Sequence, residues 1–220
     1  MTVTDTVFFD LDGTLLDTLD DLTEGVNHVL SRFSYKERTK QEICSFIGDG
    51  VPVLLGRAMS KSADQPIPEQ IRLFGEYYQA NMTKHTRPYK GINRVLTELC
   101  NRGYKIGVVS NKNDSAVKKL CYHFFGDLIS FSIGTTTYDT RKPSPFLINK
   151  ALAALEAEKK SAVLVGDTEI DIKAAESAGI KIICVGWGFR SKEFLKAAGA
   201  EIVVDNPDNL LDFFPIQKSI

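Results

Sequence analysis

The chain has 220 residues, of which 43% are hydrophobic, and its net charge is −1 with lysine and arginine scattered along it. This composition excludes a disordered chain and allows one substantial core with a smaller unit beside it. The balanced charge disfavours nucleic acid or a membrane surface as a partner.

The first predicted strand leads into a pair of acidic residues. Residues 7–9 are consecutive apolar residues, which is typical of a buried strand in a parallel sheet covered on both faces. Asp10 and Asp12 follow at the carboxyl end, where open α/β sheets bind ligands, and Gly13 lets the backbone turn. An ordinary Asp-Gly turn explains this stretch alone equally well. A calcium loop does not, because Leu15 stands where an EF-hand requires glycine.

Residues 17–87 form a predicted helical block without a convincing strand. Apolar residues at helical spacing predict helices over 19–33, 41–46, around 53–59 and 69–82. We expect Asp49 to cap the third of these helices. The aromatic residues of the last helix are better explained by packing than by ligand binding. We therefore expect an inserted helical domain, 17–87, within a core domain formed by 1–16 and 88–220.

After Pro88 the predicted helices and strands alternate. Strands are expected over 104–109, 128–133, 162–165, 181–185 and 201–204, with helices between them. This alternation predicts an α/β fold with a doubly wound parallel sheet and right-handed crossovers. Gly103 and Gly179 are placed as helix stops, and Pro145 suits the first turn of a helix.

Four cysteines are far apart in the chain and form no Cys-x-x-Cys pair. They are Cys44, Cys100, Cys121 and Cys184. Each lies in an apolar, periodic stretch, so we expect buried thiols in a reducing compartment. The N-terminus shows no basic segment followed by an apolar one, and no apolar run approaches membrane-spanning length. We expect a soluble, cytoplasmic protein.

Polar side chains stand at four places on the carboxyl edge of the predicted sheet. They are Asp10 with Asp12, Ser110 with Asn111, Lys142 in a loop, and Asp167 with Asp171. Parallel strands end at one edge, so these side chains can converge. Carboxylates that lie so near one another raise each other's pKa unless a cation lies between them. Mg²⁺ meets that need and leaves positions for phosphate and water, while Lys142 and Ser110 suit a phosphate group.

These four elements, in this order, resemble the motifs of the haloacid dehalogenase superfamily of phosphohydrolases. Residues 10–14 match the first motif and Ser110 the second, while Lys142 before Pro143 matches the third and residues 166–171 the fourth. The resemblance covers essentially the whole chain. It implies a Rossmann-like core with a helical cap inserted just after the first motif.

The resemblance also implies a role for each motif residue. Asp10 would attack phosphorus and form an aspartyl-phosphate, while Asp12 would act first as the acid and then as the base. Mg²⁺ would be held by the Asp10 carboxylate, the Asp12 backbone carbonyl and Asp167, with Asp171 orienting those ligands or water. The transferring phosphoryl oxygens would be held by Ser110, Asn111 and Lys142.

Within the superfamily, the chain is most similar to phosphoglycolate phosphatases. The supporting stretches are 87–91, 109–112 and 185–190, although Lys90 stands where that group usually has proline and the cap diverges. The resemblance implies a small phosphorylated metabolite as substrate, with 2-phosphoglycolate as the best candidate. We expect no nucleic acid or membrane partner, and a monomer or homodimer.

Smaller features have both plain and functional interpretations. Gly13 and Gly166 are expected to serve turn geometry. The loop 48–50 and the cationic Arg57 could meet the non-reacting end of a substrate, but a solvated helix face explains Arg57 at least as well. We expect the cap to exclude water and to select the leaving group.

Three other functions remain open from the sequence. A phosphosugar mutase resembling β-phosphoglucomutase shares the motifs and the cap, but returns the phosphoryl group to a sugar. A nucleotidase or pyrophosphatase of the same superfamily differs only in its substrate. A phosphoacceptor signalling domain of the receiver type also has an acidic cluster and a lysine, but the spacing of Asp10 and Asp12 and the long helical insert disfavour it.

Overall fold

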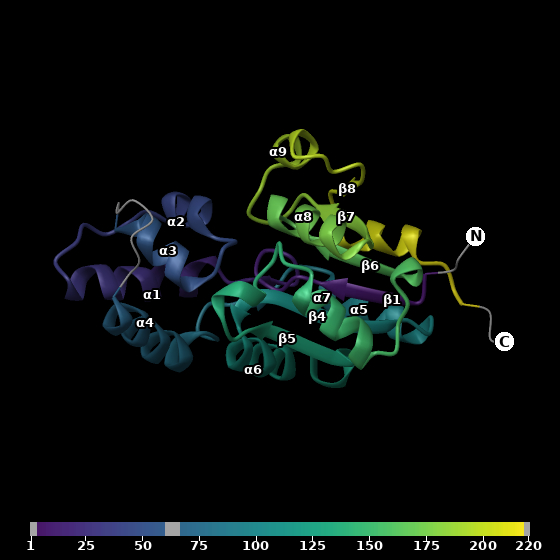
Figure 1. The fold of residues 1–220 in the computed structure, drawn as a ribbon, viewed down its shortest axis with the longest axis horizontal. Coiled ribbons are helices and arrows are strands. Elements are labelled where there is room, and N and C mark those ends of the chain that lie inside the picture. The colour runs from purple at the N-terminus through teal and green to yellow at the C-terminus, as the bar shows by residue number, and fades with distance from the viewer. Residues whose placement is uncertain (1–3, 60–66, 218–220) are drawn as a thin grey trace. The chain divides into compact units, whose positions relative to one another are not determined.

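The computed structural model describes residues 4–59 and 67–217 (Figure 1). The chain divides into two compact units. Met1–Leu16 and Pro88–Ile220 make up the core unit, and Asp17–Arg87 makes up the helical unit. The chain passes between them through β2 (Leu16–Asp17) and β3 (Arg87–Pro88), which form a two-stranded sheet.

A six-stranded sheet forms the centre of the core unit. Its strands are β1 (Thr6–Phe9), β4 (Lys105–Asn113), β5 (Phe131–Thr135), β6 (Ala162–Gly166), β7 (Lys181–Val185) and β8 (Val203–Val204). The spatial order is β5-β4-β1-β6-β7-β8, and neighbouring strands are parallel. The prediction of a doubly wound parallel sheet is therefore confirmed. The order reverses between β1 and β6, the position at which such sheets bind ligands.

The two central strands are apolar because both faces of the sheet are covered. Every residue of β1 and β6 is buried. On one face, Phe8 and Leu164 pack with buried residues of α7 and α8 in a single cluster. The Phe8 ring lies across Gly107 of β4, where a Cβ atom would come within 2.8 Å of the ring. This packing fixes β1 in the middle of the sheet.

Helices and short 3₁₀ turns connect the strands of the core unit. The helices are α5 (Ile92–Asn101), α6 (Asp114–Phe125), α7 (Phe146–Ala154), α8 (Glu169–Ala178) and α9 (Lys192–Ala197). The 3₁₀ turns are η1 (Gly126–Leu128), η2 (Tyr138–Thr140), η3 (Lys159–Ser161) and η4 (Pro207–Phe213). Gly103 and Gly179 follow helices with positive φ, as predicted for helix stops. Pro145 caps α7 instead of lying in its first turn.

Several predicted boundaries were wrong for identifiable reasons. Strand β4 continues beyond 109 to Asn113, because its polar residues are buried by contacts at the sheet edge. The next strand begins at Phe131 because η1 occupies part of the predicted range. Cys121 and Cys184 are buried thiols as expected, whereas Cys44 and Cys100, which form no disulfide, are only half-buried.

The helical unit contains α1 (Leu19–Arg32), α2 (Lys40–Phe46), α3 (Val51–Ala58) and α4 (Pro68–Asn81). Helix α1 buries one apolar face and packs against α2, α3 and α4. The prediction that Asp49 is the N-cap residue of α3 was wrong, since Gly50 with φ of 82° occupies that position. In the described ranges, no helix combines the length and apolar character needed to cross a bilayer.

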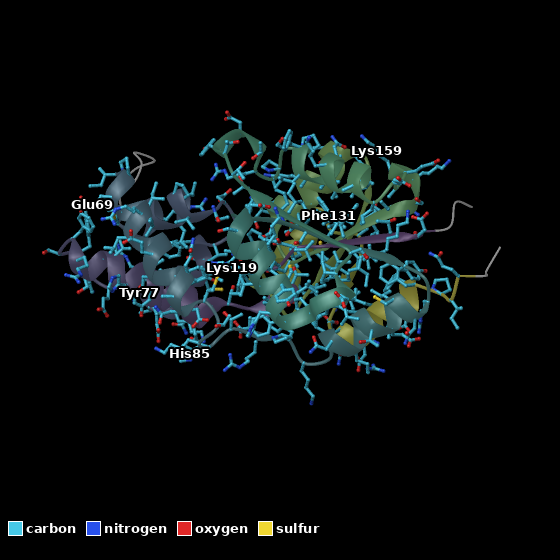
Figure 2. The ribbon with its side chains drawn as sticks, turned by 90° about the horizontal axis from the view of Figure 1, so that it is seen from below. Glu69, Tyr77, His85, Lys119, Phe131 and Lys159 are labelled. Carbon is cyan, nitrogen blue, oxygen red and sulfur yellow. The ribbon has the colours of Figure 1, made fainter. Side chains whose placement is uncertain are left out.

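Acidic residues of α1 fix the segment through which the chain leaves the helical unit. Asp21 is buried and accepts hydrogen bonds from the backbone N–H of His85 and from both the N–H and the hydroxyl of Thr86, at 2.7–3.2 Å. Glu24, one turn later, accepts a hydrogen bond from Tyr77 and pairs with His85, both labelled in Figure 2. The exit segment is thereby tied to the start of α1.

We predict that Asp21→Ala lowers the free energy of unfolding by about 2–4 kcal/mol, because it leaves buried donors without an acceptor. The neighbouring Asp20→Ala is the matched control: Asp20 is exposed and pairs with Lys40 at the surface, so the expected loss is below about 1 kcal/mol. Chemical denaturation of the two variants measures the difference. Equal losses would show that Asp21 does not hold the exit segment.

Candidate active site

Lys142 joins two strand ends at the carboxyl edge of the sheet. Its Nζ atom lies 2.9 Å from Asp10 Oδ1 and 2.7 Å from Asp171 Oδ1, and it donates to the carbonyl of Val109 at 3.0 Å. These contacts occupy the three donors of the ammonium group. The side chain is 2% exposed, so its position is fixed by these partners rather than by water.

The backbone of Lys142 is held by the side chain of Asn111 at the end of β4. Asn111 Oδ1 accepts from the Lys142 N–H at 2.6 Å, and Asn111 Nδ2 donates to the Lys142 carbonyl at 2.9 Å. Both polar groups of one amide side chain therefore contact one residue. Asn111 sets the position from which the lysine reaches Asp10.

Asp10 directly follows β1, and its N–H donates to Val165 of β6 at 2.9 Å. Its side chain is 12% exposed. Oδ1 is buried and, apart from the ion pair with Lys142, accepts no hydrogen bond from any residue that the structure describes. This oxygen is therefore available for a further electropositive partner.

Asp171 lies in the first turn of α8 and is fully buried. Its Oδ2 accepts from both the N–H and the hydroxyl of Thr168, at 3.1 and 2.7 Å, while Oδ1 contacts Lys142. The interpretation of Gly166 as turn geometry was wrong. Gly166 lies in β6 without a positive φ, and a Cβ atom there would come within 2.4 Å of Asp171 Cγ.

Asp167 is fixed by two loops that approach it closely. Its Oδ1 accepts from the Thr14 hydroxyl and its Oδ2 from the Phe189 N–H, each at 2.8 Å. A Cβ atom at Gly188 would come within 2.4 Å of Asp167, so glycine is required for this approach. Gly13 has the positive φ of 85° that the expected turn demands. The contributions of Thr14 and of the loop after β7 were missed from the sequence.

Asp12 and Ser110 lie beside this cluster. Lys112 Nζ is 2.9 Å from both carboxylate oxygens of Asp12. Ser110 is buried, and its Oγ accepts from the Lys112 N–H at 3.3 Å. Lys112 was also missed, although the period of a strand offered a signal: residues two apart lie on one face, which places Lys112 with Ser110.

The contact of Arg57 with a substrate stays a prediction, because Arg57 belongs to the helical unit. Arg57 lies in α3 of the helical unit, where it pairs with Asp49 at 2.7 Å and donates to the carbonyl of Phe46 at 2.9 Å. The loop 48–50 is thus linked to Arg57 by an ion pair.

Burial dominates the electrostatics of the cluster. It raises the pKa of Asp10 to about 6, against the opposing effect of Lys142 and with a further contribution from Asp171. Burial also raises the pKa of Asp167 well above its ordinary value, and the nearby Asp10 and Asp171 add to that rise. Burial alone would lower the pKa of Lys142, but the carboxylates of Asp10 and Asp171 raise it.

The cluster has the charge and geometry for a divalent cation. One oxygen from each of Asp10, Asp167 and Asp171 lies within 4.8 Å of the others. Three ionised carboxylates and one ammonium leave a charge of −2, which a divalent ion would neutralise. Both oxygens of Asp171 already contact Lys142 or Thr168, and both oxygens of Asp167 accept a hydrogen bond from Thr14 or Phe189.

Comparison with known proteins decides the family. The sequence model of the haloacid dehalogenase-like hydrolases matches residues 7–185. The chain belongs to this family. The resemblance inferred from the four motifs is therefore confirmed, and the chain is a hydrolase.

Relatives and solved structures agree with that assignment. A phosphoglycolate phosphatase of Aquifex aeolicus is 33% identical over 189 residues, covering 83% of this chain and 85% of the relative. One from Vibrio vulnificus is 28% identical, covering 94% of each chain. The crystal structure of a predicted phosphoglycolate phosphatase from Haemophilus somnus superimposes with a TM-score of 0.86 at 27% identity, covering 96% of this chain and 98% of the other. This hydrolase is thus a phosphatase of the family that resembles phosphoglycolate phosphatases.

We predict that Asp10→Asn stabilises the metal-free hydrolase at pH 8. With a pKa of about 6 when folded and 3.8 otherwise, Asp10 binds more protons folded than unfolded between these values, so stability falls as pH rises through them. The neutral amide of asparagine removes that loss of stability. The difference in stability between the variant and the wild type should vanish below pH 4. Thermal unfolding at both pH values measures it, with exposed Asp127→Asn as the control. A variant less stable than the wild type at pH 8 would contradict the electrostatic account.

We predict that Gly166→Ala lowers the free energy of unfolding by about 1–3 kcal/mol, because the new methyl group overlaps Asp171. Gly75→Ala in α4 is the control, since a Cβ atom there meets nothing within 4 Å and alanine favours a helix. Denaturant titration compares the two. A neutral result at position 166 would mean that α8 moves away from the sheet without penalty.

Proposed function

We propose that this hydrolase is a Mg²⁺-dependent phosphatase that cleaves a small phosphate monoester through a phosphoryl group carried on Asp10. One observation carries the proposal. The Lys142 ammonium contacts both Asp10 and Asp171, and an oxygen of Asp167 lies within 4.8 Å of an oxygen of each of these two carboxylates. All of these groups lie at the ligand-binding edge of the sheet.

Asp10 is proposed as the nucleophile. Its carboxylate attacks phosphorus, the bond to the leaving oxygen breaks, and Asp12 gives that oxygen a proton. Asp12 then takes a proton from water, and the hydroxide attacks phosphorus so that inorganic phosphate leaves and Asp10 is regenerated. Two displacements at one carboxylate replace a single harder one.

Charge stabilisation is proposed for the neighbouring residues. Lys142 and the Ser110 hydroxyl face the phosphoryl oxygens as a point charge and a hydrogen-bond donor. Asn111 contributes by fixing Lys142, because its amide already contacts the lysine backbone on both sides. Lys142 also keeps Asp10 ionised, as a nucleophile must be.

Mg²⁺ is proposed as the cation, held by the Asp10 and Asp167 carboxylates and the Asp12 carbonyl. When bound, it would supply positive charge to the phosphoryl oxygens and offset the charge of the acidic cluster. Asp171 stays on Lys142 and does not need to contact the ion.

The substrate best supported is 2-phosphoglycolate. The support is the name shared by the relatives and the stretches 87–91, 109–112 and 185–190, which resemble that group. The helical unit, inserted directly after the first motif, is proposed to be a cap that selects the leaving group.

Release of inorganic phosphate from a panel of small phosphomonoesters tests the proposal. We expect release with Mg²⁺ and none with a chelator. Asp10→Asn should abolish turnover, and Asp12→Asn should lower kcat by about 10²- to 10⁴-fold, the contribution of a positioned acid. Asp127→Asn, an exposed acid in the same unit, should leave the rate unchanged.

Other outcomes would identify a different chemistry. Full activity of Asp10→Asn would exclude the route through this carboxylate. Transfer of phosphate within a hexose phosphate, instead of its release, would show a mutase. Stable labelling of the protein without turnover would show a phosphoacceptor domain.

A further inference from the structure

A second buried cation lies at the site and is not used in the proposed chemistry. Lys112 Nζ is 2.9 Å from Oδ1 and 2.9 Å from Oδ2 of Asp12. The lysine side chain is 5% exposed and that of Asp12 14% exposed. One ammonium group therefore contacts both oxygens of the proposed acid and base.

This ion pair competes with the proposed role of Asp12. An oxygen that gives a proton to a leaving group, or takes one from water, needs a free position facing the reacting atom. In the pair with Lys112, each oxygen faces an ammonium group, which only donates. The ammonium group takes one lone pair of each oxygen and holds the carboxylate facing Lys112, so Asp12 is freer to act once it exchanges part of this pair.

The substrate itself can supply the competitor. Asp12 must reach the ester oxygen, so a group one carbon beyond that oxygen lies close to the Lys112 ammonium, which is within hydrogen-bond distance of Asp12. A carboxylate at that place offers the ammonium an equivalent anionic partner. A neutral alcohol offers none and leaves Asp12 paired.

We propose that Lys112 holds Asp12 in an idle ion pair and exchanges it for a carboxylate on the leaving alcohol, so that the enzyme favours phosphate esters of short hydroxy acids. Lys112 is thus a positioning residue for Asp12 and a determinant of specificity. This inference rests on the proposed function and adds a residue that selects the substrate class from within the core unit.

A matched pair of esters tests the inference. 2-Phosphoglycolate carries the carboxylate, and the phosphate ester of glycolamide has the same size without the charge. The wild-type enzyme should favour the first in kcat/KM by roughly tenfold to a hundredfold, as expected for one hydrogen bond to a charged group. Lys112→Met should lose that preference, with a lower rate on the acid and an unchanged or higher kcat on the amide.

Control variants separate the role of this lysine from a loss of charge or of fold. Lys118→Met removes a lysine that pairs with Asp114 on the surface of α6 and should change neither rate. Lys112→Arg keeps the cation and should keep the preference. If circular dichroism shows that Lys112→Met does not fold, the other two proteins test the inference. It then requires that the wild-type enzyme prefer the acid and that Lys112→Arg keep this preference.

The possible failures are distinct. A wild-type enzyme active on both esters without preference would overturn the inference and leave the proposed function standing. Equal losses on both esters in Lys112→Met would show a purely structural pair and would also overturn it. A wild-type enzyme that releases phosphate from other monoesters of the panel but from neither of these two would overturn the inference, and one that releases none from the whole panel would refute the proposed function itself.

Discussion

Three carboxylates share a buried space at the carboxyl edge of the sheet, and the ammonium of Lys142 joins two of them. Without that ammonium, Asp10 and Asp171 would face each other as unpaired buried charges, which proteins rarely tolerate. The lysine is in turn fixed by the Val109 carbonyl and by Asn111, so β4 determines where the cation lies. The remaining negative charge is what makes the cluster suited to a divalent ion.

The doubly wound sheet explains how these residues meet. Asp10 and Asp167 follow β1 and β6, the two strands on either side of the point where the strand order reverses. Helix α8 begins immediately afterwards and brings Asp171 over β6, at a distance that only a glycine at position 166 permits. The buried side chains of the core pack closely below this edge and support it.

Much of this arrangement could be predicted from the sequence, because it depends on periodicity. Consecutive apolar residues before Asp10 and Asp167 predicted buried parallel strands, and the residues after such strands lie at one edge of the sheet. The polar end of β4 could not be predicted in this way. Ser110 and Lys112 are strand residues despite their polarity, because partners distant in the sequence bury them. The pairing of Asp12 with Lys112 likewise joins residues far apart in the sequence, whereas the closeness of Gly166 to Asp171 depends on how α8 packs on β6.

The place of β1 in the sheet also constrains the order of assembly during synthesis. Phe9 pairs with Val108 on one side and with Val165 on the other. A nascent chain that ends before β6 leaves the second edge of β1 without a partner and its acidic residues without half of their neighbours. The ribosome therefore delivers the first strand long before its last partner, so the acidic cluster can assemble only after β6 and the start of α8 have been synthesised.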